Sequence, residues 1–241
     1  MENKNLTKRE RKELRRQEKQ AQKTQTFKSK TFKSILTWGL VVLGIALAIW
    51  GMLKLASTPV DDTPLTGEVT EDDWIKGNPN ADVILVEYSD FQCPACGVYY
   101  PIVKQMVAEY EDEIAFVYRH FPLSQHQNAR PAAYAAEAAG QQGKFWEMHN
   151  MIFDNQNSWS EDNNAASIFR GYAQNLSLDL TKYDAAVSST EVKNKVDNHY
   201  TSGVQSNVTY TPTFYLNGQK IANPSNLGEF RTLIQAALDG N

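Results

Sequence analysis

The chain has 241 residues, of which 41% are hydrophobic and 22% charged, a composition typical of a folded protein rather than a disordered one. Its net charge of −4 conceals a division: residues 1–34 hold 12 of the 24 Lys and Arg but only 4 of the 28 Asp and Glu, and the rest holds 12 basic and 24 acidic groups. This acidic remainder excludes a basic nucleic-acid-binding domain, and two cysteines exclude both a disulfide-rich scaffold and a metal site of four thiolates.

The N-terminal segment predicts a tail followed by a membrane anchor. Residues 1–33 are basic, but no apolar face runs along them, so we expect a solvated cytoplasmic tail rather than a nucleic-acid-binding arm. Residues 34–53 contain no charged side chain. A helix of that length spans about 30 Å, the thickness of the hydrocarbon core of a bilayer. We therefore predict one transmembrane helix over residues 34–54.

The charges beside this stretch predict its orientation. A basic tail stays in the cytoplasm, which places the rest of the chain outside. A cleaved signal peptide is the main alternative, but its apolar stretch is usually only about 7–15 residues long. In addition, Lys54 and Leu55 stand where cleavage would need a small residue. We expect an uncleaved, single-pass protein of the cell membrane.

The folded domain is expected over residues 74–241, after a solvated linker at 55–73 that is rich in Thr, Pro, Asp and Glu. Its first strand is predicted over residues 82–88, which are apolar and largely β-branched, and a helix is predicted from Pro94. A second strand is predicted over residues 114–121. This order predicts two parallel strands joined by a right-handed crossover.

The rest of the domain is predicted to be helical and then to return to strands. The expected helices cover residues 129–142, a segment from Phe145, and residues 161–175, 181–200 and 227–238. Short strands are predicted at 213–216 and 219–221, because Asn217 and Gly218 between them suit a type I′ hairpin turn. The pattern predicts a small mixed α/β sheet with a helical insertion over about residues 124–205.

Two cysteines, Cys93 and Cys96, follow the first predicted strand at the start of its helix. Free N–H groups and the helix dipole favour an anion there, so Cys93 should ionise more readily than a free cysteine. Pro94 suits the first helical turn, where its missing N–H costs nothing. Cys96 lies one turn deeper, close enough to attack a mixed disulfide formed at Cys93. The spacing predicts a redox-active disulfide and no further cofactor.

Three other interpretations of this pair remain open from spacing alone. A structural disulfide would close a loop of only about four residues and constrain little. A metal site would need further ligands such as His120 or His126, and no second Cys-x-x-Cys completes it. The third is a pair of buried cysteines without a function. We expect both histidines to be structural.

Longer motifs surround the cysteines. They are Asp-Trp-Ile-Lys-Gly-Asn-Pro-Asn-Ala at 73–81, Val-Glu-Tyr-Ser-Asp-Phe-Gln-Cys-Pro-Ala-Cys at 86–96, Tyr-Arg-His-Phe-Pro-Leu at 118–123, Gly-Lys-Phe-Trp at 143–146 and Thr-Pro-Thr-Phe at 211–214. With these motifs the chain from about Asp73 to Leu238 resembles the DsbA-like branch of the thioredoxin superfamily, bacterial extracytoplasmic thiol–disulfide oxidoreductases. The resemblance implies a thioredoxin fold with an inserted helical domain.

The resemblance also implies roles for individual residues. Pro212 would be the cis-proline of a loop that faces the cysteines. Glu87 matches an acid that would relay a proton to or from Cys96 if burial raises its pKa. The expected substrate-binding residues are Pro94, Ala95, Thr211 and Tyr210, with the backbone of Thr211 meeting an extended substrate as in strand addition. Tyr210 stands where many relatives have glycine.

The expected function is that of a monomeric dithiol oxidase that introduces disulfides into exported cysteine-containing proteins. The resemblance implies re-oxidation by a quinone-linked membrane partner, and no nucleic acid is expected to bind. The dipeptide Pro94-Ala95 lacks the histidine of the strongest oxidants in the family, so we expect an oxidant of intermediate strength. The alternatives are a thioredoxin-like reductase or isomerase, and a copper- or zinc-handling protein that uses the same thiols.

Overall fold

The computed structural model describes residues 63–240 and, before them, only residues 12–13, 15–20, 38, 43–45 and 47. Apart from these positions, the predicted tail and membrane anchor lie outside the described residues. Among the residues that are described, no helix has both the length and the apolar character needed to cross a bilayer. The chain divides into two units, Met1–Pro59 and Val60–Asn241, and the second contains the predicted domain.

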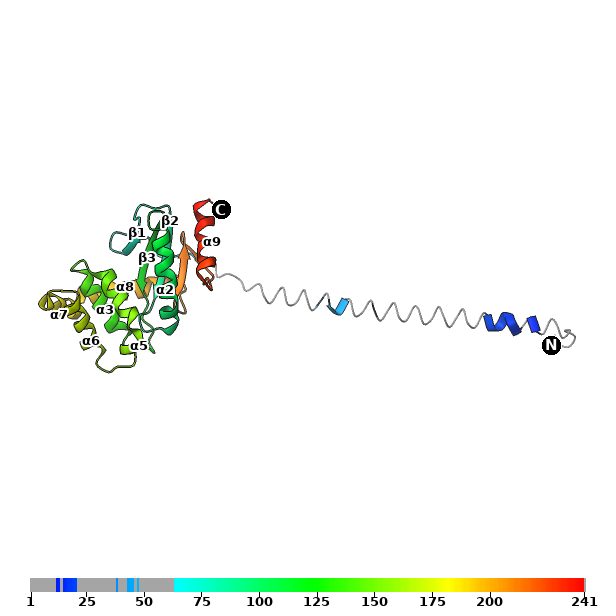
Figure 1. Cartoon of the computed structure of the whole chain (residues 1–241), viewed down its shortest axis with the longest axis horizontal. Coiled ribbons are helices and arrows are strands. Elements are labelled where there is room, and N and C mark those ends of the chain that lie inside the picture. Colours follow the sequence, from blue (N-terminus) through cyan, green and yellow to red (C-terminus); the bar gives the residue numbers. More distant parts are fainter. Residues whose placement is uncertain are drawn as a thin grey trace. The chain divides into compact units, whose positions relative to one another are not determined.

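A five-stranded sheet forms the centre of the second unit (Figure 1). Its strands are β1 (Trp74–Gly77), β2 (Val83–Ser89), β3 (Ile114–His120), β4 (Thr213–Leu216) and β5 (Gln219–Ile221), in the spatial order β1-β3-β2-β4-β5. Strands β2 and β3 are parallel, as predicted, and the other neighbours are antiparallel. The central strand β2 is buried along almost its whole length, which explains its apolar, β-branched sequence.

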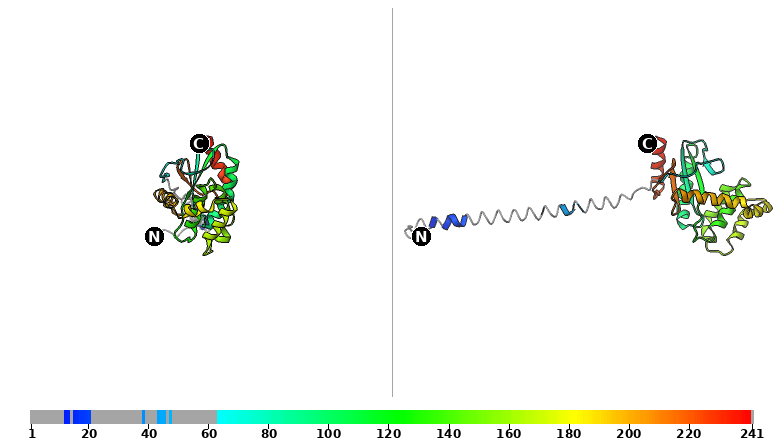
Figure 2. Two further views of the ribbon diagram at one scale, coloured as in Figure 1. Left: turned by 90° about the vertical axis from the view of Figure 1, so that its left-hand side faces the viewer. Right: turned by 180° about the vertical axis from the view of Figure 1, so that it is seen from behind.

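Helices pack around this sheet. They are α2 (Pro94–Glu109), α3 (Ala129–Gly140), α4 (Phe145–Asp154), α5 (Gln156–Trp159), α6 (Ala165–Asn175), α7 (Leu180–Ser188), α8 (Thr190–Gln205) and α9 (Leu227–Leu238). Helix α2 connects β2 to β3, and α3 to α8 form the insertion between β3 and β4. Figure 1 shows the insertion at the lower left of the domain and α9 at its right, and the buried side chains of Phe230 and Ile234 place α9 in the same apolar cluster as α2 and the insertion. Figure 2 shows α8 returning from the insertion toward the sheet.

The two faces of β2 point into different apolar clusters. Val83 and Leu85 belong to the cluster that includes α2 and the insertion, whereas Val86 and Tyr88 belong to the smaller cluster on the opposite face. Because side chains alternate along a strand, Glu87 lies on the same face as Val83 and Leu85. A carboxylic acid is thereby placed beneath α2, inside the larger apolar cluster.

Three elements differ from the sequence prediction. The helix predicted over residues 181–200 is two helices, because Ser189 has an extended backbone and its hydroxyl accepts a hydrogen bond from the N–H of Val192, which starts α8. Strand β1 and helix α5 were not predicted, since each has only four residues and no clear apolar period. The final helix, α9, has the predicted bounds.

The structure also differs from the predicted linker in residues 64–73, which pack on the domain. The N–H of Leu65 donates to the carbonyl of Gly218 at 2.8 Å. The Arg119 guanidinium donates to both carboxylate oxygens of Asp73, at 2.8 and 2.9 Å, and both side chains are buried. Leu65 and Val69 of this segment are partly buried against the smaller apolar cluster. Two apolar side chains within a polar segment give no periodic signal, so its composition did not reveal the docking.

Candidate active site

The two cysteines lie at the start of α2, as predicted, and both are free thiols. Cys93 is the N-cap residue and Pro94 occupies the first turn. Cys93 has 8% of its surface exposed and Cys96 has none. An approaching thiol can therefore reach Cys93 but not Cys96 in this structure.

The surroundings of Cys93 favour its thiolate. Hydrogen bonding from the Cys96 thiol, assisted by the backbone N–H groups of Ala95 and Cys96, lowers the pKa of Cys93 from 9.0 to about 5, although burial opposes the change. Amide groups at a helix start are fixed in place by the helix, so they stabilise an anion without reorganising. At neutral pH the Cys96 thiol and the helix-start amides together therefore hold Cys93 ionised when the pair is reduced.

The surroundings of Cys96 have the opposite effect. Complete burial, together with the negative charges of the Cys93 thiolate and the Glu87 carboxylate, raises the pKa of Cys96 well above 9.0. The hydrogen bond from the N–H of Asp90 to its sulfur, at 3.5 Å, offsets this only in part. Cys96 stays protonated at neutral pH, so ionising it requires a base within reach.

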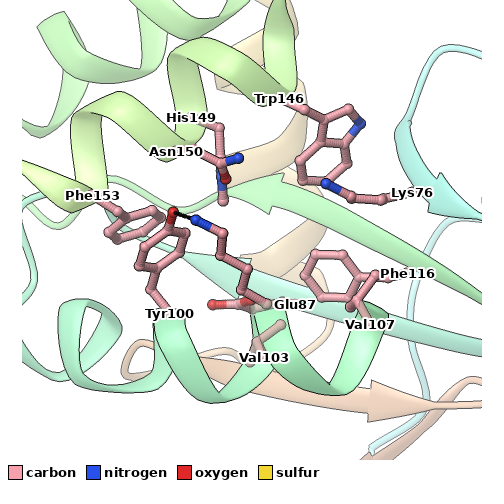
Figure 3. Close-up of a pocket in the computed structure, with 11 residues that line it drawn as sticks. Lys76, Glu87, Tyr100, Val103, Val107, Phe116, Trp146, His149, Asn150 and Phe153 are labelled. Atoms are coloured by element: carbon pink, nitrogen blue, oxygen red, sulfur yellow. Dashed lines mark hydrogen bonds between the residues drawn. The ribbon is translucent and has the colours of Figure 1, made fainter. Parts of the chain in front are cut away.

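Glu87, buried beneath α2, is the candidate for this base. Burial raises the pKa of its carboxyl from 4.5 to about 7, and its charge acts on Cys96. Figure 3 shows the carboxyl of Glu87 pointing into a small cavity between the Tyr100 and Val103 side chains of α2 and those of His149 and Asn150 on α4. The cavity measures about 30 Å³, and a water molecule needs about 10–15 Å³ by this measure. The space therefore suffices for water to carry a proton to or from this carboxyl.

The loop before β4 approaches the cysteines from a distant part of the chain. The peptide bond between Thr211 and Pro212 is cis, as the resemblance implied. The sulfur of Cys93 lies 3.4 Å from the carbonyl oxygen of Thr211, to which it donates a hydrogen bond when it is protonated. Thr211 is buried, whereas Tyr210 is 48% exposed, and Pro94 and Ala95 are exposed on the cysteine side. Of the predicted substrate-binding residues, Thr211 is therefore buried, whereas Pro94, Ala95 and Tyr210 are exposed around Cys93.

The histidines considered as metal ligands have other partners. His120 is buried and hydrogen-bonds the carboxylate of Glu137 at 2.9 Å, and His126 bonds Asp90 at 2.6 Å. Within the described part of the chain, the one group of three side chains placed to share a metal ion is His120, Glu137 and His199, which contains neither cysteine. Glu137 already accepts from the Trp74 indole and pairs with Lys195. This arrangement supports structural roles.

Polar side chains that hold the cysteine loop to the insertion were not predicted. The amide of Gln92 donates to the carbonyl of Ser160 at 2.6 Å and accepts from the N–H of Asn128 at 2.6 Å. Gln156 donates to two backbone carbonyls of the same loop. These partners lie 36–68 residues apart in sequence, and isolated Gln and Asn residues give no periodic signal.

The fold and these motifs agree with a comparison against protein families. A family model described as thioredoxin matches residues 69–236. The chain belongs to the thioredoxin family. Similar solved structures are α-DsbA1 of Wolbachia pipientis (18% identity, TM-score 0.64, covering 71% of this chain and 94% of that one) and oxidised BdbD of Bacillus subtilis (21%, 0.63, 74% and 100%). DsbA2 of Pseudomonas aeruginosa is also similar (25%, 0.56, 70% and 95%). The chain therefore has the DsbA type of thioredoxin fold.

Curated relatives match the same part of the chain. The Na(+)/H(+) antiporter NhaA 3 of Salinispora tropica is 34% identical over 166 residues, or 68% of this chain. NhaA 1 of Salinispora arenicola is 34% identical over 169 residues, or 70% of this chain. The chain spans only about a quarter of the length of these relatives, 24% and 25%. The similarity thus concerns one part of much longer proteins, to which the antiporter names belong.

Proposed function

We propose that this protein is a thiol–disulfide oxidoreductase of the DsbA type that introduces disulfide bonds into exported proteins. The observation behind the proposal is the difference between the two thiols. Cys93 is the more exposed, has a lowered pKa and lies against the cis-proline loop, whereas Cys96 is fully buried with a raised pKa. When the pair is oxidised, a substrate thiol can therefore attack the sulfur of Cys93, and the sulfur of Cys96 is released.

The reaction begins with the Cys93–Cys96 disulfide. A client thiolate attacks the sulfur of Cys93, and a new client–Cys93 bond forms as the bond to Cys96 breaks. Cys96 leaves as a thiolate and takes a proton from the carboxyl of Glu87, which the raised pKa of both groups favours. The client has then lost one thiol proton, and the protein is linked to it through Cys93.

A second client thiolate completes the reaction. It attacks the client sulfur of the mixed disulfide, and Cys93 leaves as a thiolate that the helix start stabilises. The client gains one disulfide, and the protein gains two electrons as a thiolate and a thiol. Because a stabilised Cys93 thiolate favours the reduced form, the lowered pKa supports net oxidation of the client.

The substrate surface follows from the exposed groups around Cys93. We propose that an extended client segment lies along the backbone of Thr211, beside Pro212, as an added strand. The exposed side chains of Pro94, Ala95 and Tyr210 would contact residues on either side of the client cysteine. Backbone pairing does not depend on side-chain identity, which suits an enzyme with many clients.

The rest of the proposal concerns the setting of the enzyme. The basic tail and the uncharged stretch at 34–53 support an uncleaved anchor with the catalytic domain outside the membrane and the N-terminus in the cytoplasm. A monomer re-oxidised by a quinone-linked membrane protein would complete the cycle. A copper- or zinc-handling role has less support, because His120 and His126 bond to carboxylates in this structure.

The direct test uses the full-length protein purified in detergent and oxidised. It is mixed with a reduced, unfolded secreted protein, and client disulfides are counted by thiol alkylation. We expect rapid transfer of the disulfide by the natural protein and none by Cys93→Ala. Absence of transfer by the natural protein, with tight 1:1 binding of copper or zinc by its reduced form, would overturn the proposal in favour of metal handling.

A further inference from the structure

Gln156 joins the helical insertion to the backbone of the cysteine loop. Its side-chain N–H donates to the carbonyl of Phe91 at 2.7 Å and to the carbonyl of Cys93 at 2.9 Å. The Cys93 carbonyl also accepts the first hydrogen bond of α2, from the N–H of Gly97 at 3.1 Å. Gln156, 63 residues from Cys93 in sequence, therefore holds the backbone carbonyls of both Phe91 and Cys93, which flank Gln92.

The helix that bears Gln156 is firmly attached. Trp159, at the other end of α5, is fully buried, and its indole N–H donates to the carbonyl of Ile152 at 2.8 Å. The next residue, Ser160, accepts from the Gln92 side chain, so α5 is tied to the cysteine loop a second time. A side chain on a packed element holds its partners more exactly than one on a free loop, which suits Gln156 for positioning.

Gly97 provides the space for this contact. A Cβ at position 97 would overlap the side-chain oxygen of Gln156. Glycine within a helix is otherwise less favourable than alanine, because it loses more backbone entropy on folding. The close approach of the Gln156 amide therefore accounts for a glycine directly after Cys96. It also means that any side chain at position 97 must push the amide away from the loop.

We infer that Gln156 is a positioning residue that orients the Cys93 thiol from across the domain boundary, an inference that rests on the proposed oxidoreductase function. By holding the Cys93 carbonyl it maintains the extended ψ of 122° at the N-cap. In that conformation the sulfur lies against the backbone N–H groups of Ala95 and Cys96. Gln156 acts on the backbone and not on a sulfur atom, so its effect reaches the reaction only through Cys93.

The test titrates the Cys93 thiolate by ultraviolet absorbance in the reduced full-length protein. Gln156→Ala removes both hydrogen bonds, and we expect the midpoint to rise by about one pH unit, or about tenfold less thiolate below the midpoint, the scale of one lost hydrogen bond. Gln156→Asn has a side chain one methylene shorter and should shift the midpoint in the same direction. It replaces the alanine variant in the test if that variant folds poorly.

A double-mutant cycle tests the role of Gly97. Gly97→Ala should raise the midpoint in the natural protein, because the new methyl group displaces the Gln156 amide. In the Gln156→Ala background it should add little, because no amide remains to be displaced. Full additivity of the two shifts would contradict the inference.

Asn155→Ala is the matched control. It removes an amide that donates to the carbonyl of Met151 at 2.8 Å, from the neighbouring residue, without touching the cysteine loop. We expect an unchanged midpoint. An unchanged midpoint in Gln156→Ala, or an equal shift in Asn155→Ala, would overturn the inference. Absence of client oxidation by the natural protein would instead refute the proposed function and leave the thiol titration interpretable.

Discussion

Cys93, Cys96 and Glu87 show how burial and fixed amides divide the labour among nearby groups. Hydrogen bonding from the Cys96 thiol, assisted by the helix-start amides, lowers the pKa of Cys93 to about 5, whereas burial raises the pKa of Cys96 and brings that of Glu87 to about 7. Cys93 can thereby form a mixed disulfide with a client and later be released from it as a thiolate. Cys96 stays a thiol unless a base takes its proton, and Glu87 has a pKa close to the working pH for that exchange.

The division between the thiols can be tested by trapping. Cys96→Ala leaves the more exposed, ionised Cys93 without its partner, so we expect mixed disulfides with client proteins to accumulate. Cys93→Ala should trap none, because Cys96 is fully buried. Non-reducing gel electrophoresis of cells that produce each variant measures this. Equal trapping by both variants would mean that the roles of the two thiols are assigned wrongly.

The buried carboxyl of Glu87 predicts a pH-dependent stability. Its folded pKa of about 7 lies above the ordinary 4.5, so the unfolded chain releases this proton first and the folded protein loses stability as the pH rises through that window. Glu87→Gln removes the effect. We expect this variant to be more stable than the natural protein at about pH 8, by up to about 3 kcal/mol, and to lose the advantage near pH 4.

Urea unfolding at both pH values measures the difference. Glu113→Gln is the matched control, because Glu113 is an exposed glutamate, and it should change stability little at either pH. An advantage of Glu87→Gln that is the same at both pH values would contradict the assigned ionisation.

At the scale of elements, the sequence predicted those whose apolar pattern is long and regular. Strand β2, helix α2, strand β3 and helix α9 begin within one residue of their predicted positions. The two strands are buried on both faces and give continuous apolar runs, whereas the two helices bury one face and give a helical period. The break at Ser189 was missed, since a capping serine looks like any polar residue within a helical pattern. The cysteine pair was predicted from its place after a strand. The hydrogen bonds of the Gln92 and Gln156 side chains could not be predicted, because these residues and the backbone carbonyls they bind come together only in the folded chain.

The docking of residues 64–73 also depends on tertiary contacts. Asp73→Ala would leave the Arg119 guanidinium buried without its carboxylate, and breaking such a pair costs about 3–5 kcal/mol. We expect a matching loss in the free energy of unfolding, and faster cleavage of residues 64–73 in limited proteolysis. Asp72→Ala, at the exposed neighbouring residue, should change neither result. Unchanged cleavage in Asp73→Ala would show that the ion pair does not hold this segment.

For the whole molecule, the proposal joins a redox domain to a membrane anchor, with the domain outside. Protease added to intact cells or spheroplasts should then digest the domain but spare the basic tail. Epitope tags at the two ends, followed by immunoblotting, distinguish the fragments, and lysis with detergent is the control that exposes both. Protection of the domain in intact spheroplasts would refute the orientation.

The direction of electron flow is decided by the reduction potential of the Cys93–Cys96 pair. The stabilised Cys93 thiolate favours an oxidant, and the absence of a histidine between the cysteines favours one of intermediate strength. We expect a potential between about −120 mV, the DsbA value, and about −270 mV, the thioredoxin value. Equilibrating the full-length protein in glutathione buffers and alkylating its free thiols measures this potential. A value at or below that of thioredoxin would contradict the account, because the protein would then act as a reductase.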